Sequence, residues 1–182
     1  HIPNRGFLFT TISYMYLYTF YLFFDFAGYS LMAVGASNIL GIETPMNFNV
    51  PFISVDIKDF WNRWHITLST WLRDFVFSRI VMRFMRKKIF KKRLTTAMVA
   101  YMINMTFMGF WHGITLNYIA YGFYHGILMA AFEWYQKKSK FYKKNKDKTW
   151  YKVISWLITM HLVMFGFLIF SGKMSEWARK LI

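Results

Sequence analysis

Three long and almost uninterrupted apolar segments limit what this chain can fold into. Phe7–Phe24 and Trp150–Phe170 are each long enough to cross a bilayer once, and Thr95–Trp134 is long enough to cross it twice. In hydrocarbon the backbone N–H and C=O groups of such segments must be paired internally, which a helix achieves. The sequence therefore predicts an all-α, polytopic protein of the cell membrane, with several passes.

Composition agrees with a membrane location and removes some chemistry. Of 182 residues, 56% are hydrophobic and 23% are aromatic, which exceeds what the core of a soluble domain requires. Such an excess is typical of aromatic belts at the two bilayer surfaces. The chain has no cysteine, so disulfides, thiolate nucleophiles and cysteine-ligated metals are excluded.

Positive charge is concentrated rather than spread. The net charge is +15, and the basic residues gather in two runs, Arg83–Arg93 and Lys137–Lys152, each flanked by apolar segments. This arrangement is typical of cytoplasmic loops and of attraction to anionic lipid headgroups, so membrane lipids are expected partners and nucleic acid is not. If both runs are cytoplasmic, an even number of crossings separates them, and a hairpin near Thr115–Asn117 would provide it.

The first histidine-containing stretch is Phe60–Phe75, FWNRWHITLSTWLRDF, which we expect to form one helix that continues to Met85. Its tryptophans cover one side, and its polar groups fall on two neighbouring stripes of the other. The stripes are Arg63, Thr67, Thr70 and Asp74 and, beside them, His65, Ser69 and Arg73. Such groups are unfavourable at membrane depth unless paired or hydrated, which predicts a functional site. A cytosolic amphipathic helix with a satisfied histidine is the alternative.

The second stretch, Met108–Gly113, contains His112, and its part Gly109–Gly113 is echoed at Gly122–Gly126, which contains His125. Each is a GxxxG step, which permits close helix packing. Asn104 lies two turns before His112 and Thr115 three residues after it, so these could line a polar channel. His125 and His161 are expected to be structural.

Other parts of the sequence suggest where helices begin and end. Asp25–Ser30 interrupts the first apolar run, and a second segment, Leu31–Leu40, would end at Gly41. Asp25 would cap that second segment or serve as a buried polar anchor. Glu43–Ile57 is expected to be irregular, with Asp56 and Asp59 at the start of the next helix, where their charge favours the helix dipole.

Known catalytic and metal-binding spacings are missing. No two histidines stand three or four residues apart and no carboxylate completes a ligand set, so no metal site is predicted. Ser69 follows His65 by four residues, but no third member of a triad can be identified. The remaining hypothesis is catalysis by a histidine, which acts as general base on an incoming hydroxyl in a dry site beside a membrane.

Three motifs resemble the membrane-bound O-acyltransferase family. They are FWNRWHITLSTWLRDFVF at 60–77, MGFWHGITLNYIAYGFYHG at 108–126 and FDFAGYSLMAVG at 24–35. The resemblance covers about residues 7–172. It is stronger to the branch that transfers D-alanine to teichoic acids than to alginate-type O-acetyltransferases. The latter usually have an aspartate at Leu31 and a proline-glycine-glycine step within Ser78–Arg83.

The resemblance implies a ring of transmembrane helices around a funnel and tunnel. It implies His112 as the catalytic histidine and His65 as the second functional position. The donor would be D-alanine as a thioester on the phosphopantetheine arm of an acidic carrier protein, with no covalently bound cofactor, and the acceptor lipoteichoic acid. Residues expected to contact substrate or line the tunnel are Asn62, Trp64, Ser69, Asn104, Trp111 and Thr115.

A patch after the first histidine stretch fits the acidic carrier. It combines apolar residues for burial with charges that would speed encounter. Its members are Ile80, Val81, Met82, Arg83, Met85, Arg86, Lys87 and Lys88. A helix lying on the membrane surface is the alternative.

Residues 1–182 are expected to be a single transmembrane domain, the C-terminal portion of a longer chain that supplies further parts of the protein. With no cysteine, direct transfer is expected, or transfer through a residue of another chain. Three other functions stay open: an alginate-type acetyltransferase, a transporter or channel, and a non-catalytic membrane scaffold.

Overall fold

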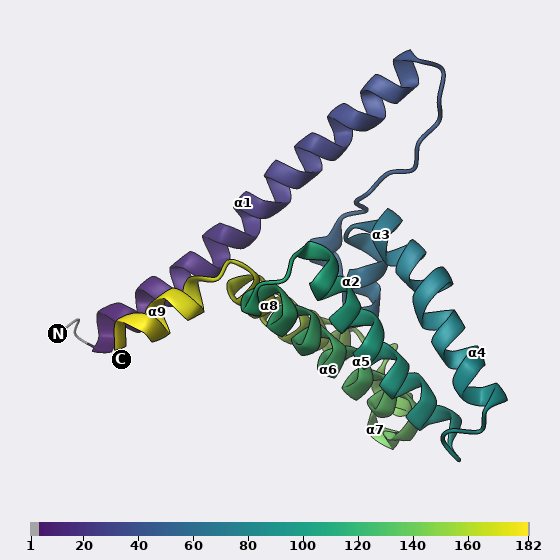
Figure 1. The fold of residues 1–182 in the computed structure, drawn as a ribbon. Coiled ribbons are helices and arrows are strands. Elements are labelled where there is room, and N and C mark those ends of the chain that lie inside the picture. The colour runs from purple at the N-terminus through teal and green to yellow at the C-terminus, as the bar shows by residue number, and fades with distance from the viewer. Residues whose placement is uncertain (1–3, 182) are drawn as a thin grey trace.

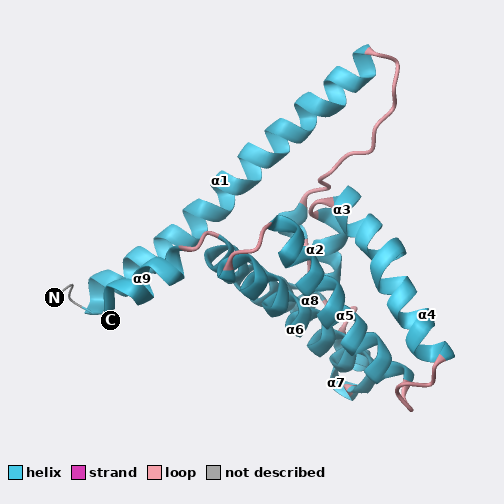
Figure 2. Cartoon of the chain, in the orientation of Figure 1, coloured by secondary structure: helices cyan, strands magenta, loops and turns pink. Residues whose placement is uncertain are grey.

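Residues 4–181 are described by the computed structural model, and their regular structure is entirely helical (Figure 2). The all-α prediction is therefore confirmed for this part of the chain. Residues 1–3 and 182, which include His1, lie outside it. A compact group of helices occupies one side of the molecule, and helix α1 extends away from it (Figure 1).

Helix α1, Asn4–Ile39, is one continuous helix of 36 residues, about 54 Å long. The predicted interruption at Asp25–Ser30 is wrong, and so are both roles for Asp25, which is an exposed residue within the helix. This segment has no proline, and a single glycine weakens a helix without ending it. The end of the helix was predicted correctly, since Gly41 follows it with a φ of 73°.

A loop with one short 3₁₀ turn, η1 (Pro51–Ile53), joins α1 to α2 (Ile57–Arg63). This confirms the irregular segment. Asp56 caps α2, because its carboxylate accepts hydrogen bonds from the backbone N–H groups of Lys58 and Asp59, both at 2.9 Å. The predicted acidic helix start is confirmed.

The stretch predicted as a single helix from Phe60 is broken. Helix α2 ends at Arg63, and α3 (Ile66–Trp71) starts two residues later. His65 adopts a left-handed backbone conformation at the break, with φ 47° and ψ 53°. The two-stripe arrangement on one helix is therefore wrong. The expected continuation is confirmed, since α3 runs through a π-helical turn, η2 (Leu72–Phe77), into α4 (Ser78–Arg86).

Helices α5 (Arg93–His112) and α6 (Leu116–Lys138) form the predicted hairpin. Their backbones approach closely at the glycines. A Cβ atom on Gly122 would lie 2.9 Å from Cα and N of Gly109, and one on Gly126 would lie 3.1 Å from Cα of Met102. These contacts confirm the tight packing expected from the glycine spacing. Both basic runs consequently lie at the same end of the hairpin (Figure 1).

The chain ends with α7 (Lys140–Asn145), α8 (Thr149–Phe170) and α9 (Lys173–Leu181). Helix α8 contacts both α6 and α1. The Tyr16 hydroxyl lies 2.6 Å from Nε2 of His161, whose Nδ1 lies 2.7 Å from the Leu157 carbonyl oxygen. Nε2 of His161 thus joins α8 to α1 while Nδ1 bonds within α8, as expected for a structural residue.

Two of the described helices are long and apolar enough to cross a bilayer, at Gly6–Ile39 and Thr149–Phe170. Helices α5 and α6 have the length but are less apolar, since polar residues such as Asn104, His125 and Glu133 interrupt them. That α5 and α6 each cross the bilayer therefore remains a prediction.

The core lies where α2, α3, α5, α6 and α8 meet. Its side chains are mostly large, and aromatic rings pack edge to face among aliphatic and methionine side chains. The most buried members are Phe60, Leu72, Met108, Tyr121, Val163 and Phe167.

Gly122→Ala should destabilise the full-length protein by about 1–3 kcal/mol, because the added methyl group meets backbone atoms of α5 that cannot rotate away. Thermal unfolding in detergent micelles measures the change. Gly28→Ala is the matched control: nothing lies within 4 Å of its added methyl group, and alanine favours a helix over glycine by about 0.5–1 kcal/mol. Equal losses in both variants would contradict the tight hairpin.

Candidate active site

His65 is placed by a break in the backbone rather than by a helical face. Its Nδ1 lies 3.1 Å from Oδ1 of Asn47, in the loop after α1. The same oxygen accepts hydrogen bonds from the hydroxyl of Thr67 at 2.8 Å and from its backbone N–H at 3.3 Å. A left-handed backbone conformation at a non-glycine residue is unfavourable and needs stabilising contacts from its surroundings. At His65, the hydrogen bonds of Asn47 provide this stabilisation.

Asn47 also connects this site to α1, since its amide nitrogen donates a hydrogen bond to Oγ of Ser30 at 3.2 Å. Because an amide oxygen only accepts, the bond to His65 assigns the ring proton to Nδ1 and leaves a lone pair on Nε2. Asn47 was not predicted as a site residue. An asparagine in an irregular segment was its only signal.

His112 is the last residue of α5 and is followed by Gly113, whose φ of 150° ends the helix. Its ring lies edge to face with those of Trp111 and Phe170, at centroid distances of 4.9 and 5.0 Å. Within the described residues its ring nitrogens make no hydrogen bond. The imidazole of His112 therefore remains available to a substrate.

His65 and His112 meet at one small cavity of about 50 Å³, which we call the histidine cavity. It has room for one or two waters or for a reacting group, and the two imidazoles are its most basic groups. Most of the lining is aromatic. The cavity is lined by Leu22, Phe26, Trp61, Trp64, His65, His112, Tyr121, Phe167 and Phe170.

A larger cavity of about 610 Å³, the polar chamber, lies on the other side of Trp61. The predicted residues Asn62, Ser69 and Asn104 line it, together with Lys58 and Arg73. Both cations have partners: Lys58 pairs with Glu133 and lies 2.7 Å from Oε1 of Gln136, and Arg73 lies 3.0 Å from Asp74. Among the residues that the structure describes, Oδ1 of the buried Asn104 has no hydrogen-bond partner, which leaves it able to accept one from a ligand.

Trp61 lines both cavities and is the wall between them. Its indole N–H donates a hydrogen bond to Nδ1 of His125 at 3.3 Å. His125 is fully buried, and a Cβ atom on Gly166 would lie 2.5 Å from its Nε2, so there is no space behind the ring. The expected packing role of His125 is confirmed, and the structure adds that this role fixes Trp61.

The other residues predicted to contact substrate differ in which cavity they line. Trp64 is buried and lines the histidine cavity, whereas Trp111 is exposed and touches the cavity's histidines from outside, its ring centroid 5.9 Å from that of His65. Asn104, His112 and Thr115, predicted to line one polar channel, do not share a cavity in the described part of the chain. Asn104 faces the polar chamber, and Thr115 is exposed at the start of α6 and lines neither cavity. The helix end at Gly113 interrupts the helical offset on which that prediction depended.

The predicted carrier patch lies on α4 and the turn after it, at the edge of the molecule (Figure 1). Met82 and Met85 are 57% and 47% exposed, and Arg83, Arg86, Lys87 and Lys88 are exposed around them. Ile80 and Val81 are half-buried. Among residues 4–181 no three histidine or acidic side chains come together as metal ligands would.

Residues 4–175 match the membrane-bound O-acyltransferase family. The chain is 52% identical over 180 residues to the teichoic acid D-alanyltransferase of Streptococcus thermophilus, covering 93% of this chain and 43% of that protein. It is 51% identical over 160 residues to the enzyme of the same name from Bacillus subtilis, covering 88% and 40%. A probable alginate O-acetylase of Pseudomonas fluorescens is 38% identical over 156 residues, covering 86% and 29%. The chain thus spans less than half the length of these relatives.

Asn47→Ala in the full-length protein should release the His65 ring, because Nδ1 and both donors of Thr67 lose their acceptor. We expect a loss of about 1–3 kcal/mol in stability and a mixture of both ring tautomers. Imidazole ¹⁵N chemical shifts report the tautomers. Asn49→Ala is the control, since Asn49 is exposed and forms its hydrogen bonds through backbone atoms. Unchanged His65 shifts in Asn47→Ala would refute the role of Asn47.

Proposed function

This chain belongs to the membrane-bound O-acyltransferase family, and we propose that it is part of a membrane enzyme that transfers D-alanine to hydroxyl groups of lipoteichoic acid. The donor is a D-alanyl thioester on the phosphopantetheine arm of an acidic carrier protein. The rest of a longer chain completes a ring of transmembrane helices, with a funnel and tunnel that lead to the histidine cavity. The observation that carries the proposal is that His65 and His112, distant in sequence, face one small, mostly aromatic cavity.

Higher identity to the two D-alanyltransferases than to the alginate O-acetylase supports D-alanine as the acyl group. An acetyltransferase is the second candidate, because the same histidine-containing segments are covered by the match to the alginate relative. The two candidates differ in the donor and acceptor, and share the chemistry of the site.

His112 acts as the general base. An acceptor hydroxyl oxygen attacks the thioester carbonyl carbon while its proton moves to an imidazole nitrogen of His112. The tetrahedral intermediate collapses to an ester, and the pantetheine sulfur leaves and takes the proton from the imidazolium. Because a thioester is already activated, no acyl-enzyme is needed, and the base contributes about a hundred- to ten-thousandfold.

His65 orients a substrate. With its Nδ1 proton directed at Asn47, its Nε2 can only accept a hydrogen bond. It therefore holds a donor, such as the acceptor hydroxyl or the ammonium of D-alanine. In this tautomer it cannot polarise the carbonyl, since that requires a proton on Nε2. Fixing the reacting groups in line supplies a large part of the remaining rate.

The polar chamber suits the pantetheine arm. The arm is a narrow chain with two amide groups, and the chamber offers amide and hydroxyl side chains within an otherwise apolar wall. Oδ1 of Asn104 accepts an amide N–H there. The carrier docks on α4, where the exposed methionines are buried by contact and the arginines steer its acidic surface.

His112→Ala in the full-length protein should lower D-alanyl transfer about a hundredfold or more, since the attacking hydroxyl loses its base. Transfer from a radiolabelled D-alanyl carrier to lipoteichoic acid in membranes measures the loss. His161→Gln is the control, because His161 lies outside both cavities and uses both ring nitrogens structurally. An acetyl-loaded carrier assayed in parallel distinguishes the acetyltransferase.

The same assay discriminates the non-enzymatic alternatives. If the protein were a transporter, the His112→Ala variant would still move part of the normal amount of its solute. If it were a scaffold, the substitution would leave its function unchanged. Either result would overturn His112 as the base.

Arg83→Glu combined with Arg86→Glu should lower kcat/KM for the carrier about ten- to a thousandfold, because repulsion replaces electrostatic steering. The loss should shrink at high salt. D-alanyl pantetheine without a carrier protein is the control substrate, and its transfer should not change. If transfer from this small donor fell equally, α4 would act on the catalytic site itself and the docking role would be refuted.

A further inference from the structure

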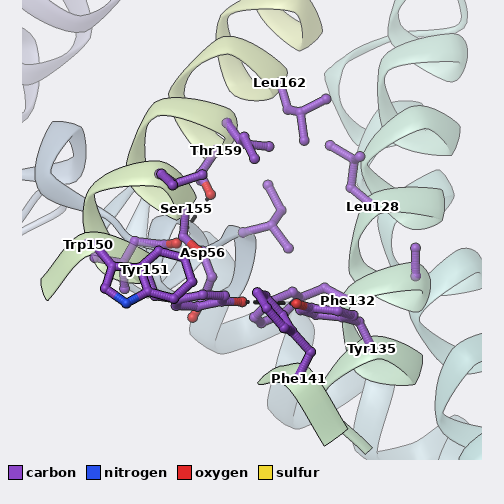
Figure 3. A pocket seen from close by; sticks show the side chains of 15 residues that line it. Asp56, Leu128, Phe132, Tyr135, Phe141, Trp150, Tyr151, Ser155, Thr159 and Leu162 are labelled. Carbon is purple, nitrogen blue, oxygen red and sulfur yellow. Dashed lines mark hydrogen bonds between the residues drawn. The ribbon is translucent and has the colours of Figure 1, made fainter. Parts of the chain in front are cut away.

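A second cavity system lies apart from the histidines, between α6, α7 and α8 (Figure 3). Its main part is a groove of about 510 Å³, a volume in the range of small-molecule sites. The lining is almost entirely apolar. The groove is lined by Val55, Asp56, Ile57, Leu128, Ala131, Phe132, Tyr135, Phe141, Trp150, Tyr151, Ile154, Ser155, Ile158, Thr159 and Leu162.

The two ends of the groove differ. One end is aromatic, with Phe141, Trp150 and Tyr151 close together, and the other contains the aliphatic side chains of Leu128 and Leu162 (Figure 3). The aromatic end belongs to the segment that carries the second basic run, and Leu162 lies deep in the membrane-spanning helix α8. The groove therefore runs from an interfacial zone of aromatic and lysine side chains toward the hydrocarbon interior.

A polar compartment of about 270 Å³ adjoins the aromatic end. Tyr151 and Ser155 line both spaces, so the two lie side by side. Two cations, Lys146 and Lys152, line the compartment. An apolar groove beside a compartment with charged side chains matches the two parts of a lipid, a hydrocarbon chain and a charged headgroup.

The positive charge that would attract an anion comes mainly from the segment around the compartment. Two acidic residues also line the compartment, Asp56 and Asp147. Asp56 is engaged in capping α2, and burial raises the pKa of its carboxyl group. Residues 137–152 contain eight lysines against the single acid Asp147, so the surroundings are strongly positive.

We propose that this cavity system binds one anionic phospholipid. The phosphate headgroup lies against Lys146 and Lys152, and an acyl chain lies along the groove toward Leu162. The ligand comes from the cytoplasmic leaflet, because anionic lipids there attract basic segments beside membrane-spanning helices. This site is separate from the histidine cavity and the polar chamber, and it needs only the membrane location, not the proposed transferase activity.

A helix from the rest of the longer chain is the competing occupant of the groove. Charge complementarity argues for the lipid. A helix packed here would have to bring an acidic end into a compartment that an anionic headgroup fits directly.

The test is photocross-linking of full-length protein in nanodiscs that contain phosphatidylcholine and phosphatidylglycerol. A benzophenone amino acid replaces Ile158, which lines the groove and is 55% exposed, and mass spectrometry identifies the adduct. We expect lipid adducts in which phosphatidylglycerol is enriched about fivefold or more over its share in the nanodisc. The same probe at Val153, which is exposed on α8 outside the groove, should report the bulk ratio.

Two variants separate the headgroup from the chain. Lys146→Gln with Lys152→Gln should abolish the enrichment, whereas Lys143→Gln with Lys144→Gln, the same charge change outside the compartment, should keep it. Ala131→Trp fills the groove and should remove the lipid adduct at residue 158. An adduct with a peptide of the protein itself, or lipid adducts at the bulk ratio, would overturn the proposal.

Discussion

The backbone contact between Gly109 and Gly122 sets the position of the α5–α6 hairpin, and the geometry of the site depends on that hairpin. Any side chain at either position would push the helices apart, because its Cβ atom would meet backbone atoms of the other helix. The contact lies three residues from His112 and one from Tyr121, both of which line the histidine cavity. His112 is thus located relative to α6 by rigid backbone, which places a reacting group more accurately than a flexible side-chain contact.

The second constraint is the break between α2 and α3, which the loop after α1 closes from both sides. The backbone N–H of Asn49 bonds to the Arg63 carbonyl at 3.0 Å, and that of Ile66 bonds to the Asn47 carbonyl at 2.9 Å. These bonds satisfy groups that a broken helix leaves unpaired. Asn47 therefore both repairs the break with its backbone and orients His65 with its side chain.

Features that depend on local spacing could be predicted from the sequence, and features that depend on tertiary contact could not. The length of the apolar run and the two basic runs predict the hairpin, and the glycine spacing predicts its close packing. Asp56 predicts the start of α2, because it acts on the helix next to it. The break at His65 has no local signal, since neither glycine nor proline marks it and Asn47 holds it from 18 residues away. The predictions for Asn104 and Asp25 failed for related reasons. Helical offset does not reveal that Trp61 divides the site, and a polar residue within an apolar run does not by itself end a helix.

Distances along α5 relate the proposed docking surface to the proposed chemistry. The helix has 20 residues and is about 30 Å long, so His112 lies about one hydrocarbon thickness from the basic end at Arg93. Asn104 lies between them, about 16 Å from Arg93 and about 12 Å from His112 along the axis. In the proposed reaction, a donor arm that enters near α4 would reach the polar chamber first and the histidine cavity second. Trp61 is common to both linings, so in the proposed reaction the acyl group would pass this side chain, whose hydrogen bond to the buried His125 fixes its position.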